Sequence, residues 1–454
     1  MAEVYERLLC ENRSTGSSTA KSEKKKASLS PTYPSSREQN LVSKTKTSSA
    51  AWKVLTNVLQ ITDGTAKFWW QKTGIPLSIL VEKAGYNIHS QYAALLFHFQ
   101  HIVYHLGPSP TQSSVPERWT SFATDDHSPI EYSWTWTSPP RVQYGVEAIG
   151  LFAGSPEDLY NRLETDILVK ELQPTTPHLD WQLYDHFRKE MHAKSDVLNT
   201  SPPSTSAQTS LGLAFELWDG NVFAKAYFAP VEEEYVGCTK LEIATMAIHK
   251  LHKLGLQMPA YDQFLQFMEG SSDLSFVCLA VDCVDPRDSR FKLYIRGGRT
   301  SFDDVCTTLK ANLAENPLWT EDLLSQLKEL WYLLLGLDKD FPTSSELPRV
   351  DHQTAGILYN VDIHKSKNVL ETSIYIPVRH YAGNDLEIAK GLGEFLYKQG
   401  NGQYVESYIQ MLTEMCSYRP LEDGCGVQTY ISCKAKKGGL FLTSYLSPEI
   451  YMQE

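Results

Sequence analysis

The stretch Arg290-Phe291-Lys292-Leu293-Tyr294 alternates polar and apolar side chains residue by residue. Successive side chains of a β-strand point to opposite faces of the sheet. The stretch therefore predicts a strand with two cations and a phenol on one face and an apolar opposite face that helices can cover. Taken singly, such a strand is also typical of an open sheet whose polar face lies in water.

Further strand-like segments divide their side chains in the same way. Their polar faces contain Lys225 and Tyr227; Glu131, Ser133 and Thr135; Arg141, Gln143 and Glu147; and Phe441, Thr443 and Tyr445. Solvent-facing strands usually mix Lys with Glu and Thr, whereas here Tyr repeatedly accompanies a cation. If the strands close around these faces, they bury cations, and buried cations require an anion such as diphosphate.

The strand-like segments come in pairs, each joined by a short polar turn. The pairs are 130–136 with 141–149, 211–218 with 222–228, 275–282 with 291–296, 356–362 with 371–377, and 428–434 with 440–446. Helical patterns lie between them at 156–172, 178–193, 239–254, 260–269, 302–313, 320–335, 385–398 and 402–416. This repeated ααββ unit predicts an α+β fold, a ten-stranded antiparallel barrel surrounded by a ring of helices.

Composition limits the possible partners, domain organisation and location of the protein. The chain has 454 residues and a formal net charge of -12, which argues against nucleic acid as the main partner. Residues 1–50 are rich in Ser, Thr and Lys and predict a disordered tail, residues 51–454 predict a single barrel domain, and the polar stretch 199–210 predicts an exposed loop. No membrane span or secretory signal is visible, and eight irregularly spaced cysteines predict reduced thiols, so we expect a cytoplasmic protein.

The expected interior suits the ionisation of an allylic diphosphate. Lys and Arg neutralise the charge that develops on the leaving diphosphate, and Tyr faces shield the resulting carbocation from water. A carboxylate such as Glu131 can accept the N–H of an indole, which places the ring and makes it more electron-rich. The sequence contains no DDxxD, Walker loop, GxGxxG, HExxH or GxSxG motif. We therefore expect charge neutralisation by Lys and Arg alone, with no metal ligands and no cofactor.

Short motifs from Trp52 onward resemble the dimethylallyltryptophan synthase-type family of indole prenyltransferases. The motifs are Phe68-Trp69-Trp70, Gln91-Tyr92, Leu106-Gly107-Pro108, Pro129-Ile130-Glu131, Asp219-Gly220 leading to Lys225-Ala226-Tyr227, and Val281-Asp282-Cys283 leading to Ser289-Arg290-Phe291-Lys292-Leu293-Tyr294. The resemblance implies the same barrel inside a ring of helices. It also implies metal-independent transfer of a dimethylallyl group, or a longer isoprenoid, from an allylic diphosphate to an indole-type acceptor in alkaloid or indole diterpenoid biosynthesis.

The resemblance assigns roles to individual residues. Glu131 falls on the Glu that accepts the indole N–H and is the expected catalytic residue. The expected diphosphate-binding cations are Lys225, Arg290, Lys292 and Lys436, and the expected tyrosine shield is Tyr227, Tyr294, Tyr375 and Tyr445. The enzyme is expected to act as a monomer or homodimer.

On the diphosphate side the sequence departs from the family at three positions. Gln143 stands where an Arg is usual, Ser373 where Gln is common, and Phe441 where Tyr is common. Arg141 lies on the same strand face as Gln143 and is expected to serve in its place. These changes also keep open a catalytically weak paralogue that only binds ligands.

On the acceptor side, Ala123, Gly212 and Val277 are the expected pocket residues. Gly212 stands where tryptophan-using members carry a Lys implicated in proton removal, and Val277 where they carry an Arg that reads the carboxylate of the amino acid. These two positions predict an acceptor larger or less polar than free tryptophan, such as an indole diterpenoid or a cyclic dipeptide. A non-indole phenolic acceptor remains an alternative.

Overall fold

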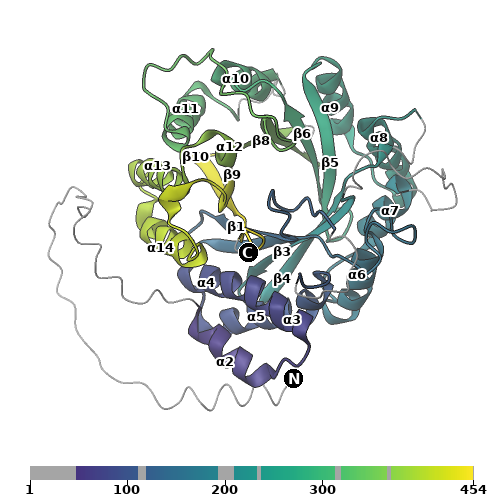
Figure 1. Cartoon of the computed structure of the whole chain (residues 1–454). Helices are drawn as coiled ribbons and strands as arrows, with labels where there is room; N and C mark the ends of the chain where they lie inside the picture. The colour runs from purple at the N-terminus through teal and green to yellow at the C-terminus, as the bar shows by residue number, and fades with distance from the viewer. Residues whose placement is uncertain are drawn as a thin grey trace, which may run out of the picture. The chain divides into compact units, whose positions relative to one another are not determined.

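A computed structural model describes residues 48–110, 119–192, 209–232, 237–311, 318–365 and 370–452. Ten antiparallel strands close into a barrel in the order β1-β10-β9-β8-β7-β6-β5-β4-β3-β2 (Figure 1). The strands are β1 Ile130–Thr135, β2 Arg141–Val146, β3 Leu211–Trp218, β4 Asn221–Phe228, β5 Leu274–Asp282, β6 Arg290–Gly297, β7 Ile357–His364, β8 Glu371–Ile376, β9 Gln428–Lys436 and β10 Gly439–Leu446. The predicted strand pairs, antiparallel closure and helical ring are confirmed.

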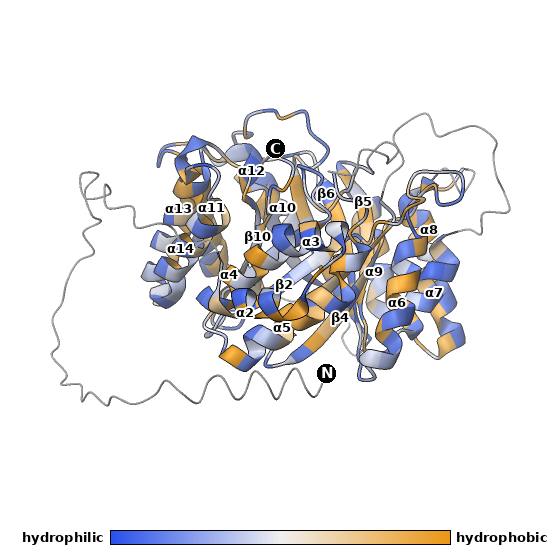
Figure 2. Cartoon of the chain, turned by 60° about the horizontal axis from the view of Figure 1, so that its bottom comes forward, coloured by the Kyte–Doolittle hydropathy of each residue, from blue (hydrophilic) through white to orange (hydrophobic). Residues whose placement is uncertain are grey.

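Helices surround the barrel (Figure 1). They are α2 Ala50–Leu59, α3 Gly64–Trp69, α4 Ile75–Lys83, α5 Ile88–His101, α6 Leu163–Thr175, α7 Gln182–Met191, α8 Lys240–His249, α9 Pro259–Glu269, α10 Phe302–Ala311, α11 Glu321–Leu335, α12 Val378–Tyr381, α13 Asp385–Lys398 and α14 Val405–Met415. Figure 2 shows hydrophilic and hydrophobic residues side by side on these helices, as expected where one face packs on the barrel and the other meets water.

Large apolar side chains fill the layer between the barrel and the helices. Trp134 of β1 and Tyr144 of β2 are fully buried, as are Trp70 and, on α11, Trp331. These strand residues have the opposite parity to Glu131 and Gln143, so the outer faces of the strands are the apolar ones. The polar faces are therefore left to line the interior of the barrel.

The predicted helix over 156–172 begins later, at Leu163. The Asp158 carboxylate accepts the backbone N–H groups of Arg162 at 2.8 Å and Leu163 at 3.0 Å. Asn161 just before the helix has a φ of 50°, which no α-helix accommodates. The apolar periodicity of the segment concealed this turn.

The described part of the chain bears on several other expectations. The described residues from 48 to 452 belong to one compact unit, while most of the expected tail and most of the expected loop at 199–210 lie outside the described residues. The seven cysteines of the described residues are free thiols. Among those residues, no helix has the length and apolar character that crossing a membrane requires.

Candidate active site

The barrel encloses a chamber of about 1130 Å³ lined by side chains from all ten strands. Strand pairing divides its wall into two regions. We call the region around Lys225, Lys292 and Lys434 the cationic end, since Lys292 interacts electrostatically with the other two lysines and shares the Asp362 carboxylate with Lys434. The region around Glu131 of β1 we call the Glu131 end. All the site residues predicted from the sequence line this chamber.

Arg290 has a partner on the neighbouring strand β5, and Lys225 has a partner on β2, on the far side of β3. Arg290 donates from Nε to Asp282 at 2.7 Å and from Nη2 at 3.2 Å, a two-point contact that fixes the guanidinium plane. Burial alone would raise the pKa of Asp282, but Arg290 lowers it below its usual value. Lys225 donates from Nζ to Gln143 Oε1 at 3.0 Å, so the uncharged Gln143 positions a cation instead of supplying one.

Asp362 of β7 connects two lysines of the cationic end. Its carboxylate lies 3.3 Å from Lys292 Nζ and 2.6 Å from Lys434 Nζ, and Lys434 also pairs with Glu371 at 2.9 Å. Burial opposes the charge of Asp362, yet Lys292 and Lys434 hold its pKa well below the usual range. Burial lowers the pKa of Lys292, and Asp362 counteracts this effect. The ionised Asp362 carboxylate thus stabilises two charged lysines inside a low-dielectric wall before a ligand binds.

Lys436 and Arg141 lie at the rim of the chamber. Lys436 is exposed, and its Nζ lies 3.5 Å from the centre of the Phe441 ring. Arg141 has a side chain 45% exposed, pairs with Glu216 at 3.0 Å and stacks 5.0 Å from the Trp218 ring. Both line the chamber, but the charge of Arg141 is already engaged outside the buried cluster.

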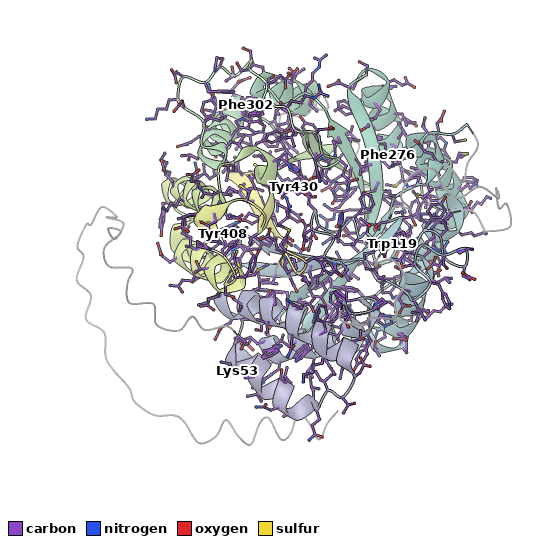
Figure 3. The ribbon with its side chains drawn as sticks, in the orientation of Figure 1. Lys53, Trp119, Phe276, Phe302, Tyr408 and Tyr430 are labelled. Carbon is purple, nitrogen blue, oxygen red and sulfur yellow. The ribbon has the colours of Figure 1, made fainter. Side chains whose placement is uncertain are left out.

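A layer of tyrosines separates the two ends. Ring centres are 6.0 Å apart for Tyr227 and Tyr294, 5.8 Å for Tyr294 and Tyr375, and 5.5 Å for Tyr375 and Tyr445. Tyr430 of β9, which is labelled in Figure 3, joins the layer, and its ring centre lies 6.4 Å from that of Tyr375. Burial raises the pKa of every one of these phenols, which stay neutral and present π-faces that attract a cation.

Glu131 extends its carboxyl group into the chamber. Thr429 Oγ1 donates to Glu131 Oε1 at 2.7 Å. Burial raises the pKa of Glu131 to about 8, while Thr429 lowers it and the nearby charge of Asp125 raises it further. The carboxyl group therefore changes protonation near neutral pH, where a hydrogen bond from an acceptor N–H is strengthened by ionisation.

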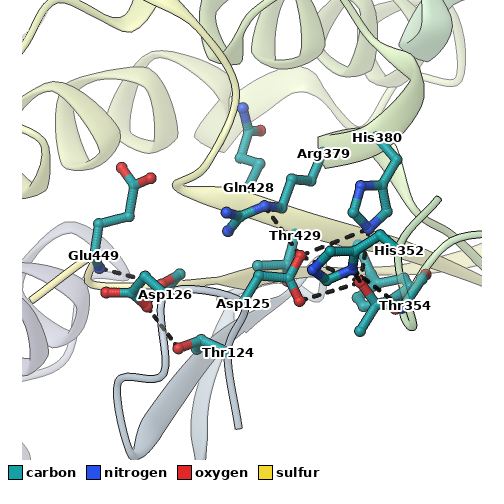
Figure 4. A network of polar contacts seen from close by, with 12 residues as sticks. Thr124, Asp125, Asp126, His352, Thr354, Arg379, His380, Gln428, Thr429 and Glu449 are labelled. Atoms are coloured by element: carbon teal, nitrogen blue, oxygen red, sulfur yellow. Dashed lines mark hydrogen bonds and ion pairs between the residues drawn. The ribbon is translucent and has the colours of Figure 1, made fainter. Parts of the chain in front are cut away.

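A polar network closes the wall of the Glu131 end (Figure 4). Asp125, which precedes β1, pairs with Arg379 of α12 at 3.0 Å and lies 3.6 Å from His380 Nε2. Thr354 Oγ1 lies 3.1 Å from Asp125 Oδ1, 2.6 Å from His380 Nε2 and 2.8 Å from His352 Nδ1. Loops and a short helix, rather than strands, supply this network.

The expected acceptor-pocket residues Ala123, Gly212 and Val277 all line the chamber. A Cβ added at Gly212 would lie 3.7 Å from Val146 O and 3.8 Å from Tyr227 Cβ, which are ordinary contact distances. The glycine is therefore not required by the backbone, and its effect is to widen the chamber. Val277 lies at a register shift of β5, between Phe276 and Cys278, and all three residues line the chamber.

The chamber residues that were missed from the sequence include Arg296, Tyr430 and Lys434. Arg296 continues the alternation of the quoted stretch by one more step, and Lys434 lies two residues before Lys436 on the same strand face. Following the period of two to the ends of β6 and β9 would have found both. Tyr430 shares the parity of Lys434 and could have been found in the same way.

Within the described ranges of the chain, two groups of side chains bring three potential metal ligands within 4.8 Å of one another: Asp125, His352 and His380, and Asp362, His364 and Glu371. In the second group, Lys434 Nζ already pairs with both carboxylates. In the first, Arg379 already pairs with Asp125. Each group therefore has a cationic side chain where an ion would bind.

The chain is similar to known prenyltransferases in sequence and in fold. The chain is 33% identical over 431 residues to the prenyltransferase anuH of Penicillium roqueforti, covering 90% of this chain and 95% of that protein. It is 32% identical over 395 residues to the 4-O-dimethylallyl-L-tyrosine synthase of Claviceps purpurea, covering 84% and 88%. The crystal structure of AnaPT from Neosartorya fischeri shares the fold, with a TM-score of 0.76, 24% identity, and coverage of 88% of this chain and 97% of that one.

These similarities and the barrel define the chain as an aromatic prenyltransferase, an enzyme that transfers prenyl groups. The family model described as tryptophan dimethylallyltransferase matches residues 65–411, and the chain belongs to that family. The family resemblance, the fold and the transferase class expected from the sequence are thereby confirmed.

Proposed function

We propose that the enzyme transfers a dimethylallyl group from dimethylallyl diphosphate to an indole-containing acceptor, without a metal, in the biosynthesis of a secondary metabolite. The observation that carries the proposal is the order of groups along the chamber: Lys and Arg, then tyrosines, then Glu131. This order matches the order of the reacting groups, which are a diphosphate, an allylic cation and an aromatic ring.

The cationic end supports ionisation of the donor. The bond between the allylic carbon and the diphosphate oxygen breaks, and its electron pair leaves with the diphosphate. Lys225, Arg290, Lys292 and Lys434 are held by partners on other strands before any ligand arrives, so little reorganisation is needed when this charge develops. We propose Lys436 as a further rim contact and give Arg141 a lesser role because Glu216 engages it.

The tyrosine layer then shields the cation until the acceptor attacks. Neutral phenols stabilise a carbocation through their faces and do not quench it as a phenolate would. An aromatic carbon of the acceptor forms the new C–C bond, and the ring then passes its proton to the released diphosphate, which restores aromaticity. Glu131 accepts the indole N–H and withdraws positive charge from the ring during attack.

The size of the chamber supports a large acceptor. Its volume of about 1130 Å³ is slightly larger than that of ordinary ligand pockets, which reach about 1,000 Å³, and the small residues Gly212 and Val277 leave space beside the wall. A phenolic acceptor is the second candidate, favoured by similarity to the 4-O-dimethylallyl-L-tyrosine synthase. For such an acceptor, Glu131 would accept a phenolic O–H in place of the indole N–H.

The test is product formation with dimethylallyl diphosphate and a panel of indoles and phenols, in the presence of EDTA. We expect a prenylated indole by mass spectrometry, with a rate that EDTA leaves unchanged. Prenylated phenols without prenylated indoles would show that the acceptor is a phenol and not an indole. Donor binding without any product would support the ligand-binding paralogue, and loss of activity in EDTA would refute metal independence.

A further inference from the structure

Arg296 continues the inward face of β6 beyond Arg290, Lys292 and Tyr294, and lies at the Glu131 end of the chamber. A guanidinium here is separated from the cationic end by the tyrosine layer. Its charge is therefore not part of the diphosphate-binding cluster. The question is which anion it faces.

The partners of Arg296 are all uncharged. Its Nη1 donates to the backbone oxygens of Thr354 at 2.7 Å and Ala355 at 3.1 Å, and its Nη2 donates to Tyr430 Oη at 3.3 Å. Within the described residues, its remaining N–H groups have no hydrogen-bond partner and it forms no ion pair. Arg290, on the same strand face, has Asp282 for this purpose.

Two carboxyl groups of the Glu131 end, those of Asp125 and Glu131, do not supply the missing charge. Asp125 is engaged by Arg379 at 3.0 Å. Glu131 has a pKa raised by burial to about 8, so its carboxyl group is largely neutral at pH 7. A half-buried guanidinium without a counter-ion is costly, and a planar carboxylate is the partner that its fork of N–H groups fits best.

A β-bulge in β9 ties Arg296 to Glu131. Ser444 pairs with Ile431 and Leu446 with Gln428, so Thr429 and Tyr430 together lie opposite a single residue of β10. Both side chains consequently line the chamber, although neighbouring strand residues normally point to opposite faces. Thr429 contacts Glu131, and Tyr430 contacts Arg296. One acceptor molecule can therefore reach both groups.

We propose that Arg296 binds a carboxylate of the acceptor, so that the preferred substrates are aromatic acids whose ring N–H or O–H meets Glu131. This inference rests on the proposed function and narrows its acceptor class. It differs from the less polar acceptor predicted from Val277. Val277 on β5 is uncharged, but Arg296 on β6 supplies a cation to the same chamber. The anchor holds one end of the acceptor while Glu131 holds the other.

The test compares acids with their isosteric amides. 3-(Indol-3-yl)propionate and its primary amide, and 3-(4-hydroxyphenyl)propionate and its primary amide, are assayed with dimethylallyl diphosphate for kcat/KM. We expect the wild type to prefer the acid of at least one pair by about tenfold to a hundredfold, the usual worth of a charge-assisted contact. Arg296→Gln should abolish the preference by slowing the acid alone, and Arg296→Lys should retain part of it.

Arg299→Gln is the matched control, since Arg299 follows on the same chain segment but pairs with Asp273 and Asp304 outside the chamber. It should leave the ratio of acid to amide unchanged. The ratio is internal to each variant, so partial loss of folded protein in Arg296→Gln does not alter it. If that variant yields no folded protein, the wild-type ratio and that of Arg296→Lys decide the question.

Equal rates for acid and amide in the wild type would overturn the assignment, as would an equal fall for both in Arg296→Gln. In either case prenylated amides would still support the proposed function. Absence of product from all four compounds and from the indole and phenol panel would instead refute the proposed function itself.

Discussion

The two ends of the chamber are built by different means. At the cationic end, Arg290, Lys292 and Lys434 contact the carboxylates of Asp282, Asp362 and Glu371 on adjacent strands, so regular strand pairing fixes each charge. At the Glu131 end, the contacts come from loops, from α12 and from the bulge in β9. A rigid end suits a constant donor, whereas an end built from loops and bulges can change its acceptor without disturbing the barrel.

The largest effect is expected from removing Lys292 at the cationic end. Lys292→Ala leaves the buried Asp362 with one cation fewer and removes a contact to the leaving group. We expect kcat/KM for the donor to fall by about 3 kcal/mol, or roughly a hundredfold. Steady-state kinetics with varied donor measures this, and Lys398→Ala on the exposed surface is the control. An unchanged rate would mean that Lys292 has no role at the cationic end.

Asp362→Asn tests whether the cationic end is prepared in advance. Without the carboxylate, Lys292 and Lys434 repel one another in the empty chamber, so we expect a loss of about 3 kcal/mol in the free energy of unfolding. Added inorganic diphosphate should raise the Tm of this variant more than that of the wild type, because it replaces the missing charge. Equal Tm shifts in both proteins would show that Asp362 does not stand in for the ligand.

At the other end, Glu131→Ala should reduce kcat by about a hundredfold while the donor Kd stays the same, as expected of a group that acts on the acceptor alone. Single-turnover assays and a donor titration measure the two quantities separately. A parallel loss of donor affinity would show that the two ends are not independent.

The pH dependence of kcat/KM for the acceptor tests the role of Glu131. Burial raises the pKa of Glu131 to about 8, so below that pH the carboxyl group is protonated and above it ionised. We expect kcat/KM for the acceptor to rise as pH increases through about 8, by up to about tenfold per unit below the pKa. Glu131→Gln should flatten the profile in this range, and a rise that persists in Glu131→Gln would assign it to another group.

The smallest effect is expected from restoring a cation to β2. Gln143 accepts a hydrogen bond from Lys225 at 3.0 Å, so Gln143→Arg places a guanidinium beside an existing charge. The attraction to diphosphate should outweigh this repulsion slightly and tighten the donor Kd by about threefold, or less than 1 kcal/mol. Calorimetric titration decides the sign, and weaker binding would show that the repulsion dominates.

The fold was predictable because barrel strands and their outer helices impose two clear periodicities on the sequence. The cations of β4 and β6 followed directly from the period of two. The predicted start of α6 was wrong because neither the hydrogen bonds from Asp158 nor the positive φ of Asn161 changes the apolar pattern of the segment.

The Glu131 end was less predictable, for a physical reason. The bulge in β9 turns Thr429 and Tyr430 to the same side, which strict alternation forbids. The network around Asp125 joins segments that lie far apart in the sequence, and only the closed barrel brings them together. Arg296 was within reach of the alternation of β6, but its unpaired charge appears only once its partners are known.

We expect the two ends of the chamber to act separately, the cationic end on the donor and the Glu131 end on the acceptor. Calorimetric measurement of the Kd for a non-ionisable thiolodiphosphate analogue of the donor, with wild type, Lys292→Ala and Glu131→Ala, tests it most directly. We predict weaker binding by about tenfold or more for Lys292→Ala and an unchanged Kd for Glu131→Ala. Equal Kd values for all three proteins, or equal losses in both variants, would contradict the account.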